Sequence, residues 1–207
     1  MTLLIPDALS FFRQSCGRWR SQRSNHHLLH RRAEAGSSLI VVEELIKGDE
    51  RLATTAELNG YEPERIIGGC WVRWSGSMAW DKAGENHEDE TIFGLIPNDE
   101  QGRSGLLLRD RGYAEKPPVA GQFSMDKQDG LILVTDYGMM SSYERFWFLG
   151  TDVRLRSSTL QGLSNSASFS MEIRVNDQES GSGTCCDTAS RTNQKSSEKD
   201  FSSSFGW

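Results

Sequence analysis

The sequence lacks several features that would assign it to a class of function. Its 207 residues carry 23 Lys and Arg against 29 Asp and Glu, a formal net charge of −6 at pH 7, whereas nucleic-acid-binding proteins usually carry a basic stripe. No apolar run approaches the roughly 18 residues that span a bilayer. Residues 1–6 are apolar but lack the basic flank of a signal peptide. We therefore expect a cytoplasmic protein that binds neither nucleic acid nor membrane.

Familiar catalytic and metal-binding motifs are also missing. There is no G-x-S-x-G, no P-loop and no G-x-G-x-x-G after a strand. The four cysteines form no C-x-x-C pair and no zinc spacing. His26 and His27 are adjacent, so in a strand they would point to opposite faces and could not ligate one metal ion. We predict no metal site and no disulfide, as is typical of a reducing compartment.

What is present is a series of short alternating segments separated by turn residues, which is typical of antiparallel strands. They cover residues 19–29, 37–45, 67–80, 91–97, 105–110, 119–126, 131–137, 141–149, 153–160 and 167–175. Two further segments, 8–16 and 49–59, have helical spacing with a glycine after the last turn. The pattern predicts an all-β fold of about ten antiparallel strands with one or two short helices. Closing such a meander into a barrel removes its exposed edges and leaves room for one small ligand.

Composition changes abruptly near residue 176. Residues 176–207 are rich in Ser, Thr, Gly and charged residues and nearly devoid of aliphatic residues. Such a segment buries too little apolar area to offset the entropy of ordering it. We predict a barrel domain over residues 1–175 and a low-complexity, disordered tail over 176–207.

Two places in the predicted barrel carry unusual side chains. Trp74, Met78 and Trp80 share one face of a single strand, and aromatic and Met side chains suit a flat, conjugated ligand. Core packing explains each of them equally well when taken alone.

Glu144 lies on one face of its strand, and Arg154 and Arg156 lie on one face of the next. An even-sum hairpin register would put all three in the interior, where ionised groups are costly unless paired and are often functional. An outward-facing surface salt bridge is the alternative.

Several segments resemble the S-type phycobiliprotein lyases of the CpcS/CpeS family. These are GRWRSQR at 17–23, WSGSMAWD at 74–81, LLR at 107–109, GYAE at 112–115, SSYERFWF at 141–148, VRLR at 153–156 and ASF at 167–169. The resemblance runs in order over residues 11–174. It implies a lipocalin-like or fatty-acid-binding-protein-like barrel that binds a linear tetrapyrrole (bilin), either phycocyanobilin or phycoerythrobilin. The lyase would attach this substrate by a thioether bond to a cysteine of an apo-phycobiliprotein, in a cyanobacterial cytoplasm or a plastid stroma.

The resemblance also suggests roles for individual residues. Glu144 would contact the pyrrole nitrogens and stabilise a protonated bilin. Arg154 would orient Glu144 or bind a propionate, and Arg18 and Arg156 are further propionate candidates. Met78, Trp80 and Trp74 would pack against the rings. The nucleophile belongs to the acceptor, so the chain needs no cofactor and no reactive cysteine of its own.

Three alternatives stay open at this point. The barrel could be a non-catalytic carrier of a bilin or another hydrophobic acid, of lipocalin type. It could be a scaffold for an interaction module in the tail. The chain could also act alone, as a homodimer, or with a related lyase subunit.

Overall fold

Ten antiparallel strands form one closed barrel in the computed structural model, which describes residues 4–78, 87–111, 119–162 and 165–175. The strands are β1 (Gly17–His27), β2 (Arg32–Ile46), β3 (Gly68–Met78), β4 (His87–Pro97), β5 (Ser104–Arg109), β6 (Gly121–Met125), β7 (Leu131–Asp136), β8 (Met140–Phe148), β9 (Val153–Gly162) and β10 (Ser166–Arg174). Each strand pairs with the next along the chain, and β1 closes the barrel against β10. The predicted all-β barrel is therefore confirmed.

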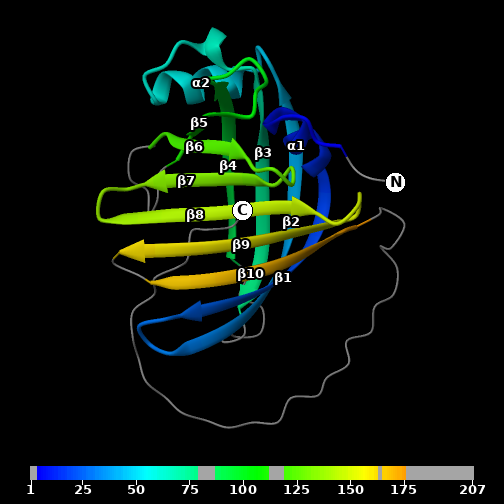
Figure 1. Ribbon diagram of the computed structural model, residues 1–207, viewed down its shortest axis with the longest axis vertical. Coiled ribbons are helices and arrows are strands. Elements are labelled where there is room, and N and C mark those ends of the chain that lie inside the picture. Colours follow the sequence, from blue (N-terminus) through cyan, green and yellow to red (C-terminus); the bar gives the residue numbers. More distant parts are fainter. Residues whose placement is uncertain (1–3, 79–86, 112–118, 163–164, 176–207) are drawn as a thin grey trace.

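The barrel is flattened into two crossing layers. Figure 1 shows β6 to β9 running across the front, with β2 to β4 crossing behind them at a steep angle. Side chains of the two layers meet in one apolar cluster that includes Trp19, Ile40, Val72, Leu107 and Phe146. Strand alternation produces this arrangement because every second residue points inward.

Helix α1 (Ala8–Ser15) covers one end of the barrel. It begins at Asp7, whose carboxylate accepts a hydrogen bond from the Ser10 amide at 2.7 Å, a common way to satisfy a free helix N–H. Phe11 and Phe12 are buried in the same cluster as the strand residues. The ring of Phe11 lies 4.9 Å from that of Phe148 on β8. Because this end is filled with aromatic side chains, a ligand has to approach from elsewhere.

The helix α2 (Glu50–Leu58) and the short 3-10 helix η1 (Pro63–Arg65) pack on the outside of the barrel, over β3 to β5. A second apolar cluster lies under them, formed by Leu45, Leu52, Ala56, Ile66, Ile96 and Leu108. Gly69 allows this close packing, since a Cβ atom there would lie 2.9 Å from Cδ2 of Leu52 on α2. These helices keep the outer faces of β3 to β5 dry and hold the wall from which Arg109 projects inward.

Both predicted helices and all ten predicted strands are present. β2 and β4 begin earlier than the pattern indicated, at Arg32 and His87 rather than near residues 37 and 91. The added residues lie at the end of the barrel away from α1 and include no large apolar side chain, so no apolar alternation marks them. No helix within the described residues is long and apolar enough to cross a membrane. The predicted tail lies outside the described residues.

Candidate functional site

The inner face of the barrel changes from apolar near α1 to polar farther along the strands. Ten polar or charged residues of the described chain are buried, and most of them belong to β7 to β10 and β1. The inward-facing members are Ser21, Thr135, Ser142, Glu144, Arg154, Arg156, Ser170 and Glu172. Polar groups buried in such number in so small a barrel indicate a site rather than a core.

The β8–β9 hairpin brings the predicted residues to this interior. Glu144 pairs with Ser158, Phe146 with Arg156 and Phe148 with Arg154. This is the register in which the glutamate and both arginines share one face. Glu144 is 2% exposed and Arg156 is 4% exposed. The interior reading of these residues therefore holds, and the surface salt-bridge alternative is wrong.

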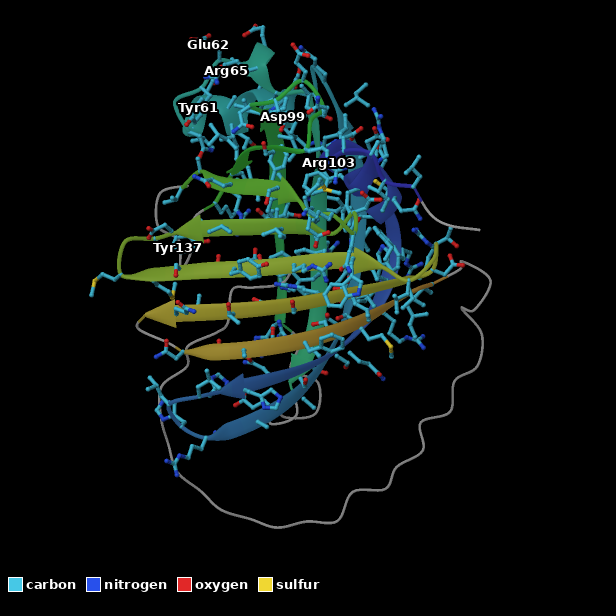
Figure 2. All side chains as sticks on the ribbon, in the orientation of Figure 1. Tyr61, Glu62, Arg65, Asp99, Arg103 and Tyr137 are labelled. Atoms are coloured by element: carbon cyan, nitrogen blue, oxygen red, sulfur yellow. The ribbon has the colours of Figure 1, made fainter. Side chains whose placement is uncertain are left out.

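Glu144 contacts two guanidinium groups. Nη2 of Arg156 donates a hydrogen bond to Oε1 of Glu144, and Nη2 of Arg109 on β5 lies 3.8 Å from Oε2. The Arg109 guanidinium also lies 5.0 Å from the centre of the Phe93 ring and 3.5 Å from the Tyr137 hydroxyl. Figure 2 places Tyr137 at the end of the front layer that is farther from α1. The carboxylate is thus held on both sides by guanidinium groups from two walls of the barrel.

Arg154 has a different partner from the one the sequence suggested. Its Nε donates to Oε2 of Glu172 at 2.5 Å, with both side chains almost fully buried. The pairing follows from the register, because Arg154 and Glu172 are direct cross-strand neighbours on β9 and β10. The Arg154 guanidinium also lies 4.9 Å from the ring centre of Trp19. Arg156 and Arg109, and not Arg154, are therefore the arginines that contact Glu144.

Arg18 does not join this group. It is exposed on the outer face of β1, since it alternates with the buried Trp19. The inward arginine of the same strand is Arg23, which pairs with Ser170 on β10, itself the neighbour of Arg156. Burial, together with the charge of Arg156, lowers the pKa of Arg23 to about 10. Counting in steps of two from Trp19 would have identified Arg23 from the sequence.

Of the three candidates Trp74, Met78 and Trp80, the structure describes the side chain of Trp74 only. Trp74 is half-buried and packs against the interior cluster. The backbone of Met78 pairs with that of Gly36 at the end of β3. The Met78 side chain lies outside the described part of the structure. Trp80 also lies outside the described residues.

Some polar atoms of this interior have no hydrogen-bond partner within the described chain. They include Nε of Arg109, Nε of Arg156 and Oε1 of Glu172. Buried polar atoms in native proteins nearly always have partners, so each such atom calls for an explanation. A polar ligand that enters the barrel can supply these partners.

A groove of about 560 Å³ lies elsewhere, along the wall formed by β10, β1, β2 and β3. Its lining residues are Gln22, Arg23, Ser24, Ala35, Gly36, Ser37, Ser77, Phe169 and Met171. Most of these alternate with the inward residues and are exposed on the outer face. The groove contains neither Glu144 nor the arginines of β9, so we place the candidate site in the interior.

The cysteines and potential metal ligands offer no competing chemistry in the part of the chain that the structure describes. Burial raises the pKa of the Cys16 thiol to about 11 and that of Cys70 well above its usual range. Both thiols are free. A protonated, buried thiol is a poor nucleophile. No cluster of three or more His, Cys, Asp or Glu side chains suited to a metal ion occurs within the described ranges.

Comparison with known proteins connects this geometry to a family. A family model described as CpeS-like protein matches residues 7–175. A chromophore lyase CpcS/CpeS 2 from Paulinella chromatophora is 66% identical over 174 residues, which are 84% of this chain and 88% of that protein. A phycocyanobilin lyase subunit CpcS from a Picosynechococcus species is 48% identical over 171 residues, covering 82% and 86% of the two chains.

A solved structure agrees with these matches. The S-type phycobiliprotein lyase CpeS from Guillardia theta superimposes with a TM-score of 0.72 at 29% sequence identity, over 81% of this chain and 92% of that one. The family model's match over residues 7–175 includes Glu144, Arg154 and Arg156. The similarity therefore covers both the fold and the wall of the candidate site.

Proposed function

The chain belongs to the CpeS-like protein family, and from this premise we propose that it is a chromophore lyase that binds a bilin in its barrel and attaches it to a phycobiliprotein. The observation that carries the proposal is the buried Glu144 carboxylate, held by Arg156 and Arg109 inside an otherwise aromatic and aliphatic barrel. Such a group does not help an apolar core to fold, because burying a charge is energetically costly. A conjugated ligand with ring N–H donors and acid side chains accounts for it.

The proposed reaction is the addition of a thiol across a double bond. The sulfur of an acceptor cysteine bonds to the ethylidene carbon of the terminal bilin ring, and the proton of the thiol ends on the adjacent carbon. No electron is gained or lost overall. Positive charge on the bilin makes the ethylidene carbon more electrophilic. Glu144, placed against the pyrrole nitrogens, would stabilise that charge as it develops.

The other residues of the interior would serve Glu144 and the pigment. Arg156 fixes the carboxylate, and Arg154 fixes Glu172 beside it. A guanidinium fork also matches a propionate, so these arginines are available for the acid side chains of the substrate. Trp74, with Met78 and Trp80 farther along the same segment, would pack against the rings. Arg18 lies on the outer face and is not included.

The nucleophile is proposed to come from the acceptor. Cys16 and Cys70 are both held protonated by burial, which makes them unsuitable to capture the pigment. A protein that holds a reactive ethylidene group without reacting with it can pass the pigment on.

Names of relatives guide the choice of substrate and partner. The Picosynechococcus relative is called a phycocyanobilin lyase subunit, so phycocyanobilin is the bilin to test first. The word subunit also supports a test for pairing with a related chain. The other relatives come largely from cyanobacteria, which supports a location in the cyanobacterial cytoplasm or in a plastid derived from it.

A transfer assay tests the proposal. The purified protein is mixed with phycocyanobilin and an apo-phycobiliprotein subunit, the mixture is denatured, and pigment that stays on the acceptor is measured. We expect covalent pigment that depends on this protein. Binding without covalent product on any acceptor would favour a carrier instead.

The variant Glu144→Gln sharpens the assay. It keeps the shape of the side chain and removes its charge, so we expect transfer to fall about 100-fold, the scale of a lost charge-stabilising group. Bilin affinity should change much less. Glu88→Gln is the matched control, because Glu88 is half exposed and pairs with Arg73 outside the barrel. Transfer by Glu144→Gln at the wild-type rate would remove Glu144 from the mechanism.

A further inference from the structure

We infer that the protein forms a two-fold symmetric dimer through the outer face of the barrel, centred where β10 meets β1, with a second copy of this chain as the partner. Two neighbouring features of that face make the contact. One is an apolar ridge on β8 to β10, formed by Trp147, Leu155, Phe169, Met171 and Ile173, and the other is a hollow beside it. These ridge side chains alternate along their strands with the buried ones, so the inference does not depend on the proposed function of the interior.

The apolar ridge exposes large side chains to solvent. Phe169, Met171 and Ile173 are 46%, 39% and 47% exposed. On β10 they alternate with the buried Ser170 and Glu172, so this strand turns its apolar side chains outward and its polar ones inward. The Phe169 ring lies 6.2 Å from that of Trp147, two strands away, so the ridge is continuous across β9. A contiguous exposed apolar patch of this kind marks an interaction surface.

The outer faces of β8, β9 and β10 are nearly free of charge. Charged residues make up 25% of the chain, but Arg145 is the one charged residue that faces outward on these three strands of the described barrel. Its Nε lies 2.7 Å from Oδ2 of Asp126, and its guanidinium lies 4.7 Å from the centre of the Trp147 ring. The buried centre of a protein interface has the same composition, depleted of charge and enriched in aromatic and Met side chains.

The hollow lies next to the ridge on the same wall. It is the groove of about 560 Å³ along β10, β1, β2 and β3, and Phe169 and Met171 of the ridge form part of its lining. Figure 1 shows β10 and β1 side by side. Side chains change from large to small where these two strands meet. One outward-facing row that crosses six strands consists in order of Trp147, Leu155, Met171, Gln22, Ser37 and Ser77.

A second copy is the partner that fits a ridge and a hollow placed side by side. A two-fold axis that runs along the wall between β10 and β1 exchanges these two strands, so the ridge of each copy enters the hollow of the other. Phe169 then faces Ser24 of the second copy, because the two residues are direct cross-strand neighbours. The two contacts are identical, so association closes at two copies. Each chain has a formal net charge of −6, but the face itself brings no like charges together.

The exposed area is enough for a weak dimer. The exposed fractions of Phe169, Met171 and Ile173 correspond to about 250 Å² of side-chain surface. With the half-buried Trp147 and Leu155 the ridge exposes about 350 Å², within the range of functional apolar patches. A hollow of similar extent doubles this to about 700 Å² for each copy, close to the roughly 800 Å² of a standard interface.

Sedimentation velocity of the full-length protein tests the inference, over concentrations from about 1 µM to about 200 µM. We expect a monomer–dimer equilibrium with a dissociation constant of about 10 µM, as suits an interface of this size. Two variants then test the arrangement. Phe169→Glu puts a charge on the ridge and Ser24→Arg puts one in the hollow. Each alone should weaken association about 100-fold, because an unpaired charge is taken out of water.

Mixing the two variants gives a sharper result. In the mixed dimer the introduced carboxylate of one copy faces the introduced guanidinium of the other, and the second ridge and hollow keep their wild-type residues. Such a pair forms a charge-assisted hydrogen bond. We therefore expect the mixture to associate within about 10-fold of the wild-type affinity.

A matched control separates the contact from the change of charge. Leu58→Glu introduces the same charge on α2, where Leu58 is 56% exposed and lies away from the ridge, so association should stay at its wild-type strength. Circular dichroism of each variant checks that the barrel has folded. If Phe169→Glu does not fold, Met171→Glu with Gln22→Arg takes its place, because these two residues are also cross-strand neighbours on β10 and β1.

Several results would overturn the inference, and none of them touches the lyase proposal. A wild-type protein that stays monomeric at the highest concentration excludes the dimer. Wild-type association by Phe169→Glu places the contact elsewhere, and a mixture that associates no better than the single variants excludes the ridge-into-hollow arrangement. A monomeric wild type that binds an apo-phycobiliprotein, with binding lost in Phe169→Glu, would assign the ridge to the acceptor instead.

Discussion

Removing the Glu172 carboxylate tests whether the buried charges are coupled as the structure has them. Glu172 and Arg154 are 0% and 1% exposed at their side chains, with 2.5 Å between Oε2 and Nε. The isosteric change Glu172→Gln leaves the guanidinium buried beside a neutral amide. Breaking a buried pair in this way typically costs about 3–5 kcal/mol.

Contacts of Arg154 place the expected loss at the lower end of that range. Its guanidinium lies 4.9 Å from the ring centre of Trp19 and 5.9 Å from that of Phe146, and such cation–π contacts persist in the variant. We therefore expect a loss of about 3 kcal/mol in the free energy of unfolding. With a urea m-value of about 2 kcal/mol per molar, the midpoint should fall by about 1.5 M.

The assay is urea unfolding followed by tryptophan fluorescence, with Glu88→Gln as the control. Glu88 pairs with Arg73 at 3.0 Å, a similar distance, but about half of each side chain is exposed, so its loss should cost less than about 1 kcal/mol. Adding Arg154→Met to Glu172→Gln should recover most of the stability, because the unpaired charge is then gone. Equal losses of stability in Glu172→Gln and Glu88→Gln would refute this reasoning. So would a double variant, Arg154→Met with Glu172→Gln, that is no more stable than Glu172→Gln alone.

Three further expectations concern other parts of the chain. Burial raises the pKa of Cys16 from 9.0 to about 11. Its smaller thiolate fraction should make it react with iodoacetamide at pH 8 about 100-fold more slowly than an ordinary thiol. Peptide mapping measures the rate, and fast alkylation would show that the thiol is not buried. Trp74→Ala should weaken bilin binding by about 10-fold because a contact with the rings is lost. An unchanged affinity in a bilin titration would mean that Trp74 serves only the packing of the core. Deleting residues 176–207 should leave pigment transfer unchanged, and its loss would assign function to that segment.

The fold was predictable because alternation and turn chemistry act locally. Ten segments with period-two alternation, separated by glycine and asparagine turns, suffice to indicate a meander, and the structure has all ten strands. The early starts of β2 and β4 were missed for a physical reason. Near the end of the barrel away from α1, their side chains are polar or exposed on both faces, so no apolar period marks them.

The sequence predicted which side chains of the site face the interior, but not which side chains pair with one another. Alternation put Glu144, Arg154 and Arg156 on one side of their strands, and the hairpin register confirms it. Which carboxylate each arginine meets depends on the neighbouring strand. Arg154 lies opposite Glu172 on β10, a strand that the hairpin pattern does not include. Arg109 contacts Glu144 from β5, and a pattern within one strand or hairpin cannot predict a contact between residues so far apart in the sequence.

The cost of these charges argues that they serve a ligand. Replacing a buried ion pair by apolar residues of similar volume is often neutral or stabilising, and this barrel already has two apolar clusters, one inside and one under α2. Folding therefore does not depend on burying Glu144 with its two guanidiniums or the Arg154–Glu172 pair. A ligand that brings ring N–H groups and carboxylates would supply partners for Nε of Arg109, Nε of Arg156 and Oε1 of Glu172. These buried polar groups are thus the ones that would make the barrel selective for such a ligand.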